Sequence, residues 1–116
     1  MGDPGCLFCR IIKKEIPAKI VFEDDKILAF EDIKPQAPVH ILLIPKRHIG
    51  KVSDLTEADA RMAGELILAA KKIAGERGVG GSGYRIVLNC DKDAGQEVFH
   101  LHLHLLGGRK FSWPPG

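Results

Sequence analysis

Three of the five histidines in this chain stand at alternate positions near its C-terminal end. His100, His102 and His104 alternate with leucines in the stretch QEVFHLHLHLLGG. Because successive side chains of a strand point to opposite faces, the three imidazoles are expected to share one face and the leucines the other. The leucine face then belongs to the core, so the histidine face is predicted to be exposed or functional.

Three interpretations of the histidine face compete. The imidazoles are solvated or satisfied within the core, they bind a zinc ion with an open position for hydrolysis, or one of them is a nucleophile. Histidine has no strand propensity that would explain three in register, and a catalytic zinc usually requires a further ligand and a carboxylate base. We therefore favour the nucleophile, since a neutral imidazole with a pKa of about 6.5 keeps a free lone pair at neutral pH. Attack on phosphorus would form an N–P bond that water later breaks.

A second group with potential chemistry is the CxxC pair Cys6 and Cys9. With Cys90 the chain has an odd number of cysteines and no export signal, so a disulfide framework is not expected. The pair fits redox chemistry, half of a zinc site, or two small buried side chains. We assign no role to Cys90.

Length and composition predict a single domain over residues 1–116. The chain is 45% apolar and 28% charged, and no apolar run is long enough to span a membrane. Seventeen basic and fifteen acidic residues give a net charge of +2, which favours neither a nucleic acid nor a membrane as partner. The absence of a signal peptide predicts a cytoplasmic protein.

The apolar patterns predict elements that would hold these residues in place. We expect a short helix over 6–14, a long helix over 57–77, and strands over 19–23, 27–31, 39–45, 84–89 and 98–106. Thr56 and Asp59 form a capping-box pattern before the long helix, and Gly78 is a natural stop after it. With one long helix available, the prediction is an α+β domain whose antiparallel sheet is covered on one side.

The motif HLHLHLL resembles the His-φ-His-φ-His-φ-φ signature (φ, apolar) of the histidine-triad (HIT) superfamily of nucleotide hydrolases and transferases. Four further stretches, FEDDKILAFEDIKPQAPVHILLIPKRHI, GYRIVLN, AGQEVFHLHLHLLGGR and the terminal WPPG, resemble its Hint branch. The resemblance covers nearly the whole chain and implies a HIT-like fold. It also implies a purine nucleoside phosphoramidase that cleaves the P–N bond of nucleoside 5′-phosphoramidates and lysyl-nucleotide adducts through a nucleotidyl-histidine intermediate.

The same resemblance implies roles for individual residues. His102 matches the nucleophile, His104 would bind the phosphate or the leaving group, His40 would join the proton relay, and His100 would support them. The residues that match nucleotide-binding positions, besides His102 and His104, are Phe8, Ile11, Phe30 and Ile33 around the base, Asp32 at the ribose, and Asn89, Gly95, Gln96, Glu97 and Val98 near the phosphate. From the residues alone, the four apolar side chains fit ordinary core, and Asp32 fits a turn before Pro35.

Glu97 departs from many Hint proteins, which have serine at this position. A carboxylate accepts hydrogen bonds and repels anions, whereas a serine hydroxyl can donate to a phosphate. We therefore expect Glu97 to favour cationic leaving groups such as a lysine ε-amine.

Relatives also suggest a metal and a partner. Some hold a structural zinc, and the matching ligands here are Cys6, Cys9, His48 and His100; such a closed site would stabilise the fold without taking part in catalysis, which requires no cofactor. Hint proteins are homodimers in which residues 113–116 reach toward the partner's active site, with Trp113 the expected contact.

Two alternatives stay open: a dinucleoside polyphosphate hydrolase that uses the same His102, and a non-catalytic nucleotide-binding scaffold.

Overall fold

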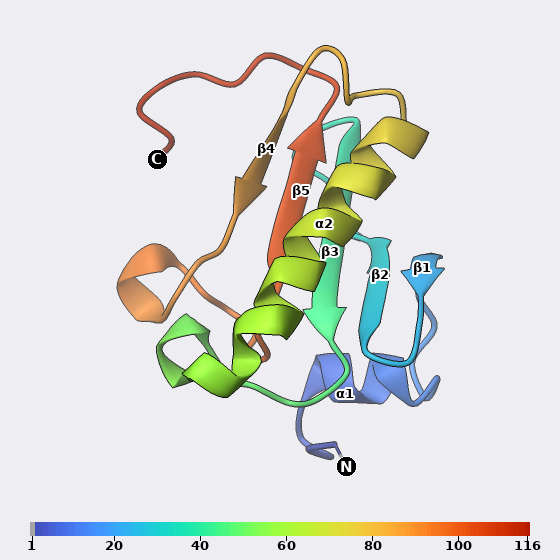
Figure 1. Cartoon of the computed structure of the whole chain (residues 1–116), viewed down its shortest axis with the longest axis vertical. Helices are drawn as coiled ribbons and strands as arrows, with labels where there is room; N and C mark the ends of the chain where they lie inside the picture. The colour runs from blue at the N-terminus through green and yellow to red at the C-terminus, as the bar shows by residue number, and fades with distance from the viewer. Residues whose placement is uncertain (1) are drawn as a thin grey trace.

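The computed structural model describes residues 2–116, which form a five-stranded antiparallel sheet and two α-helices (Figure 1). The strands lie in the order β1-β2-β3-β5-β4. Their bounds are Ile20–Glu23 for β1, Ile27–Glu31 for β2, Val39–Pro45 for β3, Tyr84–Val87 for β4 and Leu103–Gly107 for β5. The helices are α1, Leu7–Ile12, and α2, Ala60–Glu76, with short 3-10 turns at Val52–Asp54, Glu57–Asp59 and Lys92–Ala94. The predicted α+β class, antiparallel sheet and pair of unequal helices are confirmed.

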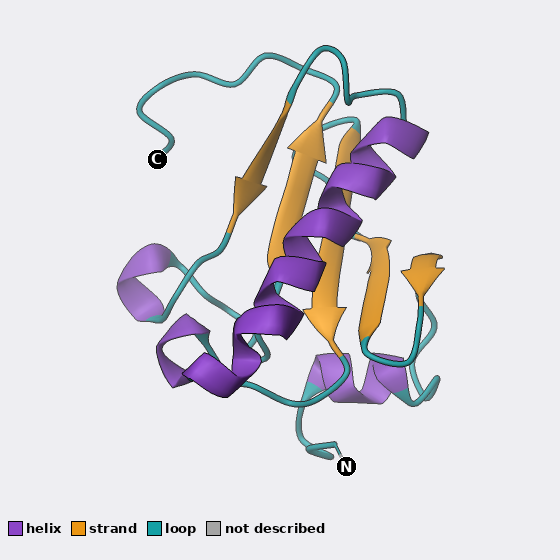
Figure 2. Cartoon of the chain, in the orientation of Figure 1, coloured by secondary structure: helices purple, strands orange, loops and turns teal. Residues whose placement is uncertain are grey.

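Helix α2 crosses one face of the sheet (Figure 2). Its buried side chains Leu66 and Ile73 pack on the leucines that alternate with the histidines and on apolar residues of β2 and β3. The capping box predicted at Thr56 and Asp59 is present, although it begins a 3-10 turn that leads into α2. Gly78 ends the helix with a φ of +78°, a conformation that glycine adopts without strain. This face is the main core of the protein.

The opposite face of the sheet is partly covered by α1. Phe8, Cys9 and Ile11 are buried against the β2 and β3 side chains that alternate with those under α2, among them Phe30 and Leu42. The prediction of a sheet covered on one side is therefore wrong at this end of the molecule. Alternation on β3 and β5 places His40 and His104 on the α1 face.

The last strand begins later than predicted. β5 starts at Leu103, so His100 and His102 precede it rather than lie within it. The ladder with β3 stops at the pair Leu43 and Leu103, and the backbone N–H of Leu101 donates instead to the carbonyl of Ile49 at 2.6 Å. Strand β4 likewise ends at Val87, before the predicted residue 89. Among the described residues, no helix is long and apolar enough to cross a membrane.

Candidate active site

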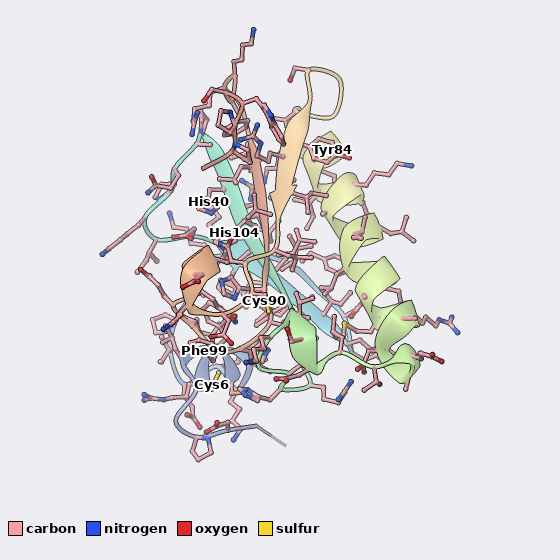
Figure 3. The ribbon with its side chains drawn as sticks, turned by 90° about the vertical axis from the view of Figure 1, so that its left-hand side faces the viewer. Cys6, His40, Tyr84, Cys90, Phe99 and His104 are labelled. Atoms are coloured by element: carbon pink, nitrogen blue, oxygen red, sulfur yellow. The ribbon has the colours of Figure 1, made fainter. Side chains whose placement is uncertain are left out.

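Three imidazoles gather on the α1 face of the sheet. His40 comes from β3 and His104 from β5 (Figure 3). Their ring centroids lie 5.2 Å apart, and the His102 ring lies 5.0 Å from that of His104. His40 and His102 are buried, at 6% and 8% exposed, so the histidine face is not a solvated surface. The alternation of the sequence persists through residues 100–104 even where the strand ladder does not.

The hydrogen bond of His102 determines which of its nitrogens is free. Its Nδ1 lies 2.8 Å from the carbonyl oxygen of His100, so Nδ1 carries the proton and donates it there. In a neutral imidazole the other nitrogen then holds a lone pair. His102 lines a cleft, and its Nε2 holds the lone pair that a nucleophile needs.

His104 has the opposite arrangement. The backbone N–H of Gln36 donates to His40 Nδ1 at 3.0 Å, so the proton of His40 is on Nε2. That Nε2 donates to His104 Nδ1 at 2.9 Å, which leaves the proton of His104 on its own Nε2. The Oδ2 atom of Asp32 lies 3.5 Å from His40 Nε2 and shares this donor. His104 therefore presents an N–H donor beside the lone pair of His102.

Burial keeps the imidazoles of His40 and His104 neutral. Desolvation, assisted by the neighbouring His102 and His40, lowers the pKa of His104 to about 4. Desolvation also lowers the pKa of His40, against the opposing charge of Asp32. Both rings are therefore uncharged at neutral pH, as the hydrogen-bond directions require.

The half-buried position of His104 predicts a dependence of stability on pH. Its folded pKa of about 4 lies below the ordinary 6.5, so the unfolded chain takes up the proton first as the pH falls. The free energy of unfolding should lose about 2 kcal/mol from this residue between pH 7 and pH 5. In His104→Gln this part of the loss should be missing, as measured by urea unfolding at both pH values. Equal losses in the two proteins would contradict the burial argument.

A cleft of ≈ 390 Å³ opens beside these histidines. It brings together most of the residues that the sequence predicted for a nucleotide: Phe8, Ile11, Phe30, Asp32, Ile33, Asn89, Gly95, Glu97, Val98, His102 and His104. Phe8 packs edge-on against Phe30, with centroids 5.5 Å apart, and against His102 at 5.2 Å. Phe8, Ile11 and Phe30 are buried, so these side chains belong to the core and also line the cleft. Ile33, in contrast, is 91% exposed at the rim of the cleft.

Further residues line the cleft that the sequence analysis missed, namely Leu7, Ile16, Pro17, Ala18, Glu31, Lys34 and Leu42. Leu42 could have been found, because it lies two residues from His40 on a predicted strand and so shares its face. No local sequence pattern identifies residues 16–18 as cleft residues, because they reach the cleft only through the path that the chain takes after α1.

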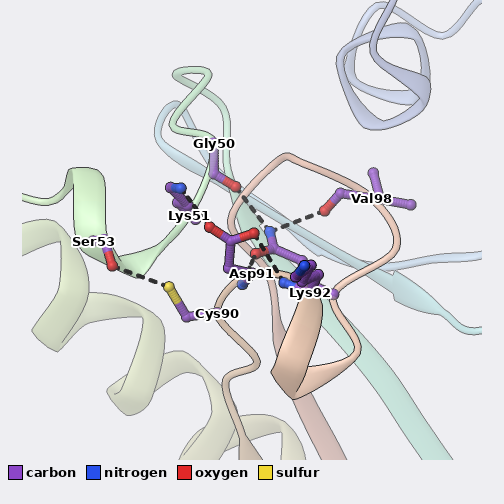
Figure 4. A network of polar contacts seen from close by, with 8 residues as sticks. Gly50, Lys51, Ser53, Cys90, Asp91, Lys92 and Val98 are labelled. Atoms are coloured by element: carbon purple, nitrogen blue, oxygen red, sulfur yellow. Dashed lines mark hydrogen bonds and ion pairs between the residues drawn. The ribbon is translucent and has the colours of Figure 1, made fainter.

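Gln96 does not line the cleft, contrary to its predicted place near the phosphate. Its side chain is buried, donates from Nε2 to the carbonyl oxygens of Gly50 and Val98 at 2.9 and 3.1 Å, and accepts from the N–H of Asp91 at 2.8 Å. An ion pair of 2.6 Å between Lys51 and Asp91 strengthens the same network, which Figure 4 shows from close by. Gln96 thus shapes the loop over 89–98, whereas Asn89 and Gly95 of that loop reach the cleft.

His100 also lies apart from the cleft, because its side chain turns toward the cysteine pair. Its Nδ1 is 3.5 Å from the Sγ atoms of both Cys6 and Cys9, and the Nδ1 of His48 is 3.2 Å from Cys9 Sγ. The donor atoms of these four residues all lie within 4.8 Å of one another. His100 Nε2 donates to the Pro45 carbonyl at 2.8 Å, which leaves the Nδ1 lone pair directed at the thiols. A catalytic role for the His100 side chain is therefore not supported by its placement.

The donor set fits zinc. Bond lengths of about 2.3 Å to sulfur and about 2.0 Å to nitrogen place tetrahedral S and N ligands about 3.5 Å apart. Three of the four S···N pairs lie 3.2, 3.5 and 3.5 Å apart, and the fourth, Cys6 with His48, lies within 4.8 Å. All four groups are buried or half-buried, as in a closed structural site.

Comparison with known proteins identifies the family of the chain. Residues 13–111 match the HIT domain family. The chain belongs to the HIT family. It is 54% identical over 110 residues to a HIT-like protein of Synechocystis sp., covering 95% of this chain and 96% of that protein.

Solved structures give the same result. A HIT family hydrolase from Legionella pneumophila Philadelphia 1 is 53% identical, with a TM-score of 0.95 over 97% of this chain and 100% of that one. A histidine triad protein from Clostridium difficile is 42% identical, with a TM-score of 0.93 over 97% of each chain. These likenesses confirm the HIT fold and support a hydrolase.

Proposed function

We propose that this HIT protein is a purine nucleoside phosphoramidase of the Hint type, which hydrolyses the P–N bond of nucleoside 5′-phosphoramidates. One observation carries the proposal: His102 offers a lone pair and His104 an N–H donor, side by side in one cleft. A displacement at phosphorus requires this pair of opposite states, because one group must attack while another protonates the departing amine.

The reaction proceeds in two balanced steps. In the first, His102 Nε2 bonds to phosphorus, the P–N bond of the substrate breaks, and the amine leaves with the proton of His104 Nε2, which a proton from solvent replaces. In the second, water attacks the nucleotidyl-His102 intermediate, the bond to Nε2 breaks, and the proton that the water loses passes through His104 to solvent as the nucleoside monophosphate forms. His40 holds the proton on the correct side of His104 through both steps.

The rest of the cleft suits a nucleoside. Phe8, Ile11 and Phe30 form an apolar slot whose aromatic faces and edges can stack on a purine. Asp32 stands at the same cleft, with Oδ1 held by the N–H of Lys34 at 2.8 Å, and its carboxylate can accept hydrogen bonds from ribose hydroxyls.

Two structural features complete the proposal. A zinc ion held by Cys6, Cys9, His48 and His100 would fasten α1 to the remainder of the fold, while the chemical steps need no cofactor. A second copy of the chain would pair with this one, with residues 113–116 toward the partner's active site. The open edge strand β4 and the 82% exposed Trp113 are consistent with such a homodimer.

The function is tested by substrate choice. Purified protein should release the amine from adenosine 5′-phosphoramidate much faster than it cleaves diadenosine polyphosphates, as measured by kcat/KM. Faster cleavage of the polyphosphates would favour the dinucleoside polyphosphate hydrolase. Tight binding of AMP without turnover of either substrate would favour the scaffold.

Glu97 is expected to select cationic leaving groups. It lines both the cleft and a neighbouring hollow of ≈ 300 Å³ that also contains Asp3 and no lysine or arginine among the described residues. Glu97→Ser should reduce the preference for a lysyl over a neutral-amine adduct about fivefold, because one attraction of about 1 kcal/mol is lost. The measurement is the ratio of kcat/KM for the two substrates, with Glu76→Ser on α2 as a charge-matched control. An unchanged ratio in Glu97→Ser would refute the role.

A further inference from the structure

Two arginines hold the segment that follows β5. The guanidinium carbon of Arg109 lies 4.3 Å from the ring centroid of Phe111, and that of Arg85 lies 5.0 Å from it. Arg85 also donates to the carbonyl oxygen of Ser112 at 3.0 Å. Residues 109–112 therefore follow a definite path beside the end of the sheet.

Arg109, unlike Arg85, is bonded to the loop that precedes β3. Its Nε donates to the carbonyl oxygen of Gln36 at 3.0 Å, in the loop between β2 and β3. Gly108 allows this close approach, because its φ is +90° and a Cβ there would lie 2.9 Å from the Cβ of Pro38. The C-terminal segment is thus attached directly to the loop that precedes His40.

Gln36 connects this attachment to the histidine relay. Its carbonyl accepts from Arg109, and its N–H donates to His40 Nδ1 at 3.0 Å. The position of this one backbone residue therefore decides whether His40 Nδ1 has a donor. That donor, together with Asp32 Oδ2 at 3.5 Å from Nε2, places the proton of His40 on Nε2 and, through the 2.9 Å contact, the proton of His104 on its Nε2.

We infer that Arg109 is a positioning residue that sets the proton arrangement of His40 and His104 by holding Gln36. Without this hold, His40 Nδ1 loses its donor and its alternative tautomer becomes accessible. In that tautomer His40 presents a lone pair to His104, which must then carry its proton on Nδ1. His104 would direct a lone pair instead of an N–H at the reacting phosphate, and protonation of the leaving amine would fail.

The kinetic test compares two arginine variants. The kinetic consequence rests on the proposed phosphoramidase function. Arg109→Met should lower kcat for adenosine 5′-phosphoramidate about tenfold and leave KM within about twofold, because the relay and not nucleotide binding is affected. The matched control Arg85→Met removes contacts to Phe111 and Ser112 but not the bond to Gln36, and should keep both constants within about twofold. Equal losses in the two variants, or no loss in Arg109→Met, would overturn the inference.

A second measurement does not depend on turnover. Nitrogen-15 NMR of the imidazoles should show His40 protonated on Nε2 in the unaltered protein and in Arg85→Met, with a shift toward Nδ1 protonation in Arg109→Met. An unmoved His40 tautomer in Arg109→Met would overturn the inference even if kcat falls. A protein that shows the tautomer change but hydrolyses no phosphoramidate would support the positioning role and refute the proposed function.

Discussion

Replacing His102 with alanine is expected to lower phosphoramidate turnover by at least about 10⁴-fold while AMP binding persists. The loss is large because the variant has no group to form the covalent intermediate, so both steps of the reaction disappear together. Binding should persist because the apolar slot of Phe8, Ile11 and Phe30 and the carboxylate of Asp32 are unchanged. The measurements are steady-state release of amine and calorimetric titration with AMP.

His104→Ala is the matched comparison. It retains the nucleophile and removes only the N–H donor, so its loss should be smaller, about 10² to 10³-fold. Quenching the unaltered enzyme with alkaline denaturant during turnover, which preserves the acid-labile N–P bond, should also trap a nucleotidyl group on His102, found by mass spectrometry of its peptide. Equal activity of His102→Ala and the unaltered protein, or a nucleotide trapped on another residue, would contradict the proposed mechanism.

Loss of the proposed zinc is expected to have the largest effect on stability. Cys9 approaches both His48 and His100, so Cys9→Ser should eliminate zinc binding and lower the Tm by about 10 °C or more. Without zinc, no metal would join the two imidazoles and the remaining thiol where α1 meets the rest of the fold. Metal content by mass spectrometry, on protein purified without a histidine tag, and thermal unfolding give the two readouts.

The third cysteine provides the control for this experiment. Cys90 contacts Ser53 at 3.2 Å on another part of the surface and is no member of the four-residue cluster. Cys90→Ser should therefore retain zinc and the Tm of the unaltered protein. A protein that is metal-free as purified and melts at the same temperature as Cys9→Ser would refute the zinc site.

The sequence by itself determined the face on which each residue of the triad region lies. Three local patterns depend only on residues that are close in sequence: the alternation of leucine and histidine, the apolar run of β3 and the capping box. The structure contains the element that each of them predicts. The residues that line the cleft were largely predictable too, because the resemblance to the HIT family supplied positions that composition alone would have left as core.

Only the tertiary structure decided how the polar side chains are paired. Gln96 turned away from the cleft, His100 turned toward cysteines more than 90 residues away in sequence, and His40 and His104 met across two strands. Each of these pairings depends on where separate segments of backbone come to lie, at distances of about 3 Å that no local pattern encodes. Which imidazole nitrogen carries a proton follows from those contacts, and so the opposite protonation of His102 and His104 is decided only in the folded protein.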